Sequence, residues 1–264
     1  MSATHFEEFE PERLVKSTDR VRDLGEVFTP SNIVDDMLDL LPDMIWQVHP
    51  SPTFLEPSVG NGNFVSAVLS RKLSLIDEAF GKESLPAGTG VKAAEFHALE
   101  ALASIYGIDI SEDNIIGGTP GHEVACRPRL LKIMKRWHDA ILRDSSQEDT
   151  DFLKAASWIL DHNMVIGNML PLDANGKPTG REDLSILEYV WRPTTLSVQI
   201  LRTTMGDVIG EAEEASSDVL SLFGPSPAVE FWSGQAHTIH EAEHHAKTTL
   251  TGVKISNSKG AVNG

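Results

Sequence analysis

The chain has 264 residues, of which 41% are hydrophobic, so it is long enough to bury a hydrophobic core. Its 22 Lys and Arg against 39 Asp and Glu give a net charge of −17, which opposes unaided binding to nucleic-acid phosphates. The single cysteine excludes a disulfide framework and a cysteine-rich metal site. Because no apolar run approaches the ~20 residues that span a bilayer and no signal peptide is recognisable, we expect a cytoplasmic protein with no membrane partner and no metal.

The first informative segment is Asp23–Pro30, which reads DLGEVFTP. Proline is tolerated in the first turn of a helix but not in its interior, so Pro30 predicts that a helix begins here. Asp35 and Asp36 then lie early in this helix, where the helix dipole favours acids. Residues 1–23, upstream, are predicted to form a charged N-terminal arm.

The next segment, Thr53–Phe64, reads TFLEPSVGNGNF and predicts a strand, a tight glycine turn and then a helix. Gly60 and Gly62 permit positive φ and let the backbone come close to a ligand. The helix that follows offers free N–H groups at its start. In an open α/β sheet this layout is typical of an adenosyl-cofactor site.

The third segment, Ser104–Ile110, predicts a short buried strand with Asp109 at its carboxyl end. An acid at the end of the second strand of a nucleotide-binding fold accepts hydrogen bonds from ribose hydroxyls. Ile110 could then pack on the adenine. A simpler role for Asp109 is to help start the following helix.

The rest of the chain predicts further elements of an α/β protein. In chain order these are a helical insertion over 111–161, a strand at 163–168, a strand at 184–191 and an amphipathic helix at 199–215. We therefore expect an N-terminal arm (1–23), an α/β domain (24–215) and a loop-rich C-terminal extension whose end is disordered (216–264).

The three segments resemble, in order and spacing, motifs of the S-adenosylmethionine-dependent DNA adenine amino-methyltransferases of restriction-modification systems. That family carries Gly-x-x-Phe-Thr-Pro, then Asp-Pro-Ala-Cys-Gly-Ser-Gly-x-Phe, then Gly-x-Asp/Glu-x. The resemblance implies a Rossmann-like class I methyltransferase sheet with helices on both faces, S-adenosylmethionine as cofactor and DNA as substrate. By the same resemblance, the cofactor-binding residues would be Phe28, Thr29, Pro30, Glu56, Pro57, Gly60, Gly62, Phe64, Asp109 and Ile110.

The catalytic motif of that family, Asn/Asp-Pro-Pro-Tyr/Phe after the fourth strand, does not occur in this chain. In one alignment Asn168 is the catalytic residue, although Met169, Leu170 and Pro171 follow it. In the other, Asn168 lies near the adenine of the cofactor and the catalytic tetrapeptide is missing. The function expected is adenine methylation in DNA, with a partner subunit for DNA recognition. The alternatives are a catalytically inactive protein that binds cofactor or partner proteins, and an acidic DNA mimic.

A basic run offers the one candidate DNA-contacting surface. Arg129, Lys132 and Arg136 recur at helical spacing and could form a stripe on a helix. A solvated helix face explains the same pattern.

Overall fold

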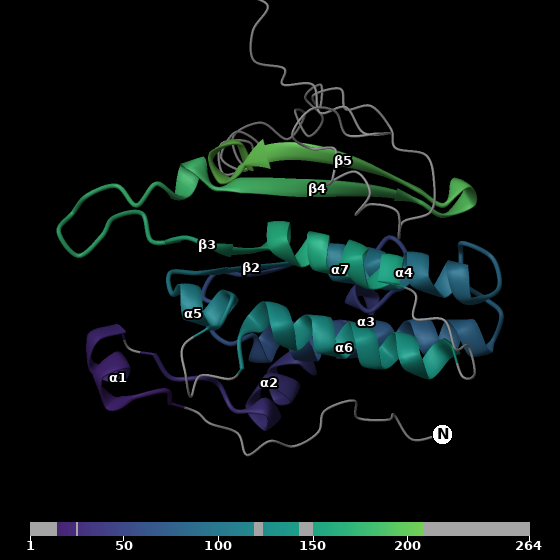
Figure 1. The fold of residues 1–264 in the computed structure, drawn as a ribbon, viewed down its shortest axis with the longest axis horizontal. Coiled ribbons are helices and arrows are strands. Elements are labelled where there is room, and N and C mark those ends of the chain that lie inside the picture. The colour runs from purple at the N-terminus through teal and green to yellow at the C-terminus, as the bar shows by residue number, and fades with distance from the viewer. Residues whose placement is uncertain (1–14, 25, 119–123, 143–149, 209–264) are drawn as a thin grey trace, which may run out of the picture.

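The computed structural model describes residues 15–24, 26–118, 124–142 and 150–208. It shows a mixed α/β protein with a small parallel sheet of three strands, helices packed around it, and a separate antiparallel hairpin (Figure 1). The expected α/β class is confirmed. The parallel sheet holds the strands predicted at the start of 53–64, within 104–110 and at 163–168.

The parallel sheet has the strand order β1-β2-β3, with β1 at Phe54–Glu56, β2 at Ile105–Asp109 and β3 at Met164–Ile166. Phe54 pairs with Ile105, and Gly107 pairs with Met164. Since parallel strands end at the same edge of a sheet, the segments that follow β1, β2 and β3 all emerge at one edge. Gly167 N extends the pairing there by donating to Asp109 O at 2.9 Å.

Helices connect these strands. They are α1 (Thr18–Leu24), α2 (Ser31–Leu38), α3 (Asn63–Gly81), α4 (Val91–Ala103), α5 (Glu112–Ile115), α6 (Cys126–Leu142) and α7 (Thr150–Asn163). α4 ends one residue before β2, and α7 runs directly into β3, so both helices lie beyond the amino ends of these strands (Figure 1). α3 packs against α4 and α6, and α6 against α7. The predicted insertion over 111–161 is thus seen as α5, α6 and α7.

The hydrophobic core lies among the four long helices α3, α4, α6 and α7. Nearly every side chain of α4 is buried, because α4 is covered by α3, α6, α7 and the hairpin. The largest fully buried side chains include Trp137, Phe96 and Phe152. A buried polar contact crosses the core, with His138 Nε2 2.8 Å from Glu95 Oε1.

The hairpin consists of β4 (Ser185–Arg192) and β5 (Ser197–Thr204) and lies over α4 and α7 (Figure 1). Two tyrosines attach it to the rest of the molecule. Tyr106 Oη of β2 donates to Leu187 O, and Tyr189 Oη of β4 donates to Asn163 Oδ1 at 3.0 Å. The strand expected at 184–191 is therefore present, but outside the parallel sheet.

The prediction of a helix at 199–215 is wrong over its first part, where the chain forms β5. Pairing decides the outcome: the whole of Ser197–Thr204 pairs with β4, and its residues Val198, Ile200 and Leu201 are buried. The helical turn begins only at Met205. The rest of that prediction, and all of 216–264, lie outside the described residues. None of the helices described is long and apolar enough to cross a membrane.

Candidate functional site

The glycine turn after β1 is fixed to the neighbouring strand. Val59 N donates to Ile108 O at 2.9 Å, which holds the turn beside the end of β2. Gly60 has φ +55° and Gly62 has φ +90°, so both occupy the left-handed region that favours glycine. Gly62 precedes α3, which begins at Asn63, so the predicted order of strand, glycine turn and helix is present.

The Phe-Thr-Pro element lies directly on this turn. A Cβ atom at Gly60 would be 3.0 Å from Phe28 Cε1, so the buried ring packs against bare backbone. Asn63 Nδ2 donates to Thr29 O at 2.7 Å, and Arg129 Nη1 donates to Asn63 Oδ1. Pro30 then begins α2. Two segments that are about thirty residues apart in sequence therefore meet at the glycine turn.

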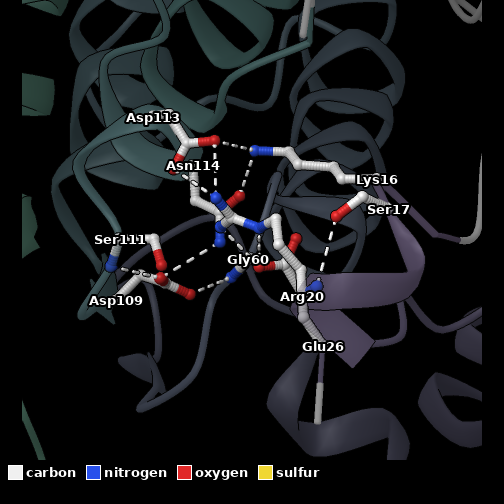
Figure 2. Close-up of polar contacts among 9 residues, drawn as sticks. All are labelled: Lys16, Ser17, Arg20, Glu26, Gly60, Asp109, Ser111, Asp113 and Asn114. Atoms are coloured by element: carbon white, nitrogen blue, oxygen red, sulfur yellow. Dashed lines mark hydrogen bonds and ion pairs between the residues drawn. The ribbon is translucent and has the colours of Figure 1, made fainter. Parts of the chain in front are cut away.

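Asp109 joins the third segment to the other two. Its carboxylate is only 7% exposed, and its Oδ2 accepts a hydrogen bond from Gly60 N at 2.8 Å. Its Oδ1 accepts from Ser111 N at 2.8 Å and from Asn114 Nδ2 at 3.1 Å, as Figure 2 shows. The acid therefore holds the glycine turn and the start of α5 at the same edge of the sheet.

The remaining predicted residues surround this junction less closely. Glu56 Oε1 accepts from Ser58 N at 3.2 Å, and burial raises the pKa of Glu56 although this hydrogen bond opposes the rise. Ile110 is 59% exposed and offers an apolar surface beside Asp109. Pro57 is exposed, whereas Phe64 packs partly buried against the core.

Asn168 lies just past β3. Its Oδ1 accepts from Leu170 N at 3.0 Å and so shapes the turn that leaves the strand. Because β3 pairs with β2, Asn168 lies next to the carboxyl end of β2, which carries Asp109.

A polar cluster at the site was missed by reasoning from sequence. Lys16, Arg20 and Glu26, from α1 and its flanks, meet Asp113 and Asn114 of α5 (Figure 2). Lys16 and Asp113 are 97 residues apart, and no local pattern links them. Burial alone would raise the pKa of Asp113, but the hydrogen bonds and charges of Lys16 and Arg20 lower it below its ordinary value.

The basic run of α6 contributes to the fold more than to an open surface. Arg127 donates to Met164 O at 2.7 Å and to Asp161 Oδ1 at 2.9 Å, which ties α6 to α7 and β3. Arg129 orients Asn63 at the glycine turn. Of the predicted stripe, Lys132 is exposed and Arg136 is half-buried.

One group of side chains has the composition of a metal site, which the sequence did not suggest. His49, His97 and Glu100 bring their ligand atoms within 4.8 Å of one another. Ala87 N donates to His97 Nε2 at 3.1 Å, so the proton of this imidazole is on Nδ1, which lies 3.0 Å from Glu100 Oε2. Metal-binding histidines donate from their second nitrogen, whereas this one accepts. The group therefore fits a buried hydrogen-bond network better than a cation site.

Comparisons of the chain with protein-family models, with curated proteins and with solved structures found no match. The function is therefore argued from the site. A glycine turn, a buried carboxylate and an exposed apolar side chain at the carboxyl edge of a parallel sheet can together hold a nucleoside.

Proposed function

We propose that the chain binds S-adenosylmethionine at the carboxyl edge of β1, β2 and β3, and that it serves methyl transfer to the amino group of adenine in DNA. The observation that carries this proposal is the meeting of the three motif segments at one point. Phe28 covers Gly60, Asn63 holds Thr29, and Asp109 accepts from Gly60 N. Contacts among residues of three separate motifs support one shared ligand site.

Each residue has a role in this proposal. Asp109 accepts a hydrogen bond from the ribose, and Ile110 packs on the adenine. The backbone at Gly60 and Gly62 lines the cofactor. Glu56 faces the methionine end, where its half-buried carboxylate would attract the ammonium group.

Strand order bears on the role of Asn168. In doubly wound sheets the fourth strand pairs with the first, on the side away from the second. β3 instead pairs with β2, and no strand in the described part of the chain pairs with the other edge of β1. This favours the alignment that places Asn168 beside the cofactor adenine. The catalytic tetrapeptide would then come from a partner subunit.

Exposed apolar side chains support such a partner. They lie on β1 and on the segment before it, at Met37, Leu40, Met44 and Leu55. Trp46 of this segment stacks on Phe54 of β1 with ring centroids 5.6 Å apart, so the segment is held beside the strand. Exposed apolar side chains of this kind are available to a protein partner. A basic partner would also offset the charge of −17 that opposes DNA binding.

Transfer of radiolabelled methyl groups to DNA tests the proposal. The chain is incubated with labelled S-adenosylmethionine and unmethylated DNA, alone and with the products of neighbouring genes. We expect label in adenine only when a partner is added. In that complex Asn168→Ala should raise the KM for the cofactor and leave kcat nearly unchanged. A loss of kcat at constant KM would instead make Asn168 catalytic.

A non-catalytic protein that binds the cofactor is the second candidate. It is favoured by the lack of a fourth parallel strand among the residues described. Cofactor binding without label transfer to DNA, under every partner combination, would select it over the methyltransferase.

A further inference from the structure

We infer that Lys16, acting through Asn114, positions the Asp109 carboxylate so that it accepts one ribose hydroxyl rather than two. The inference rests on the proposed function, because it concerns how the nucleoside is held. It assigns a role to the cluster in Figure 2 that no sequence motif indicated.

The first step is to count the acceptor positions of Asp109. An ionised carboxylate has about four, two on each oxygen. Ser111 N and Asn114 Nδ2 fill both positions on Oδ1, and Gly60 N fills one on Oδ2. In the described part of the chain no other donor reaches this carboxylate, so one position remains, on Oδ2. A ribose with two free hydroxyls therefore finds a single acceptor.

The second step concerns the direction of the Asn114 amide. Lys16 Nζ is a donor only, and it contacts Asn114 Oδ1. This contact fixes the oxygen toward Lys16 and leaves Nδ2 facing Asp109. The Asn114 side chain is 2% exposed, so no water competes freely for either end of the amide.

The third step is the anchoring of Lys16 itself. Its ammonium lies 2.9 Å from Asp113 Oδ2, and Arg20 Nη1 donates to both oxygens of Asp113 at 3.1 and 3.0 Å. The N-terminal segment is thus attached to α5 by buried and half-buried charges. Lys16 and Asn114 are positioning residues, since they act on the nucleoside only through Asp109.

The experiment measures the affinity of the full chain for S-adenosylhomocysteine and for its 2′-deoxy and 3′-deoxy analogues, by titration calorimetry. In the wild type we expect one analogue to bind about as tightly as the parent, and the other about tenfold more weakly. Asn114→Ala opens a second acceptor position on Oδ1, so both analogues should then lose affinity relative to the parent. In Lys16→Met both analogues should likewise lose affinity relative to the parent, because the Asn114 amide is no longer fixed toward Asp109.

Lys82→Met is the matched control, because Lys82 pairs with Glu78 on an exposed helix face. It should leave the wild-type pattern unchanged. Equal losses for both analogues in the wild type would overturn the inference without any variant, and so would an unchanged pattern in folded Asn114→Ala. If the wild type binds none of the three nucleosides, the proposed function fails as well, which is a distinguishable result.

Discussion

Gly60→Ala probes the contact between the Phe-Thr-Pro element and the glycine turn. At φ +55° an alanine costs about 1–2 kcal/mol of folding free energy from backbone strain alone. Its Cβ would also lie 3.0 Å from Phe28 Cε1 and 3.1 Å from Cδ1, so the buried ring must move by a few tenths of an ångström. We expect this displacement to weaken S-adenosylmethionine binding by about tenfold, or about 1.4 kcal/mol.

Gly176→Ala separates the two effects. Gly176 has φ +76°, and no atom lies within 4 Å of its Cβ position, so it carries the backbone cost without the steric one. Urea unfolding should show a loss of stability in both variants, larger in Gly60→Ala because of the added contact with Phe28, and calorimetric titration should show weakened binding for Gly60→Ala alone. Equal cofactor affinity in the two variants would refute the role of Phe28 over the turn.

Three further predictions concern the core and its buried polar groups. Gly107→Ala places a Cβ 2.7 Å from Met164 Sδ and should destabilise the fold by about 1–3 kcal/mol in thermal unfolding, whereas Gly81→Ala, with no neighbour within 4 Å, should not. Burial lowers the pKa of Lys72 from 10.5 to about 7, with Glu100 opposing the shift. Above that pKa the unfolded chain binds more protons than the folded chain, so the free energy of unfolding should rise from about pH 7 to about pH 8.5. In Lys72→Met the free energy of unfolding should depend less on pH over this range. An equal pH dependence in both proteins would contradict the prediction. Added zinc should leave the unfolding temperature unchanged, because both His97 nitrogens already hold hydrogen bonds, and a rise that chelator reverses would contradict that.

The strands that end at the candidate site could be predicted from sequence because their signals are local. The glycine turn, Pro30 and the apolar run before Asp109 each specify their own structure within a few residues. The α/β class follows from their alternation with helices. The position of Asp109 at the carboxyl end of its strand was predicted for the same reason.

The rest depends on contacts between distant residues, which no local pattern encodes. Lys16 and Asn114 meet across 98 residues, and Phe28 meets Gly60 only because α2 packs on α3. β5 was predicted as a helix because its apolar residues fit either period over a short window. Pairing with β4, at Tyr189 and Ile200 for example, decides for the strand.

Calorimetric titration of S-adenosylmethionine into the wild type, Asp109→Ala and Asp173→Ala tests the cofactor site most directly. Asp173 is the matched control, since its carboxylate also accepts backbone N–H bonds, from Asn175 and Lys177, but in an exposed turn. We predict saturable binding by the wild type, weakened by about tenfold or more in Asp109→Ala and unchanged in Asp173→Ala. No binding by the wild type, or equal affinity in the wild type and Asp109→Ala, would contradict the proposed site.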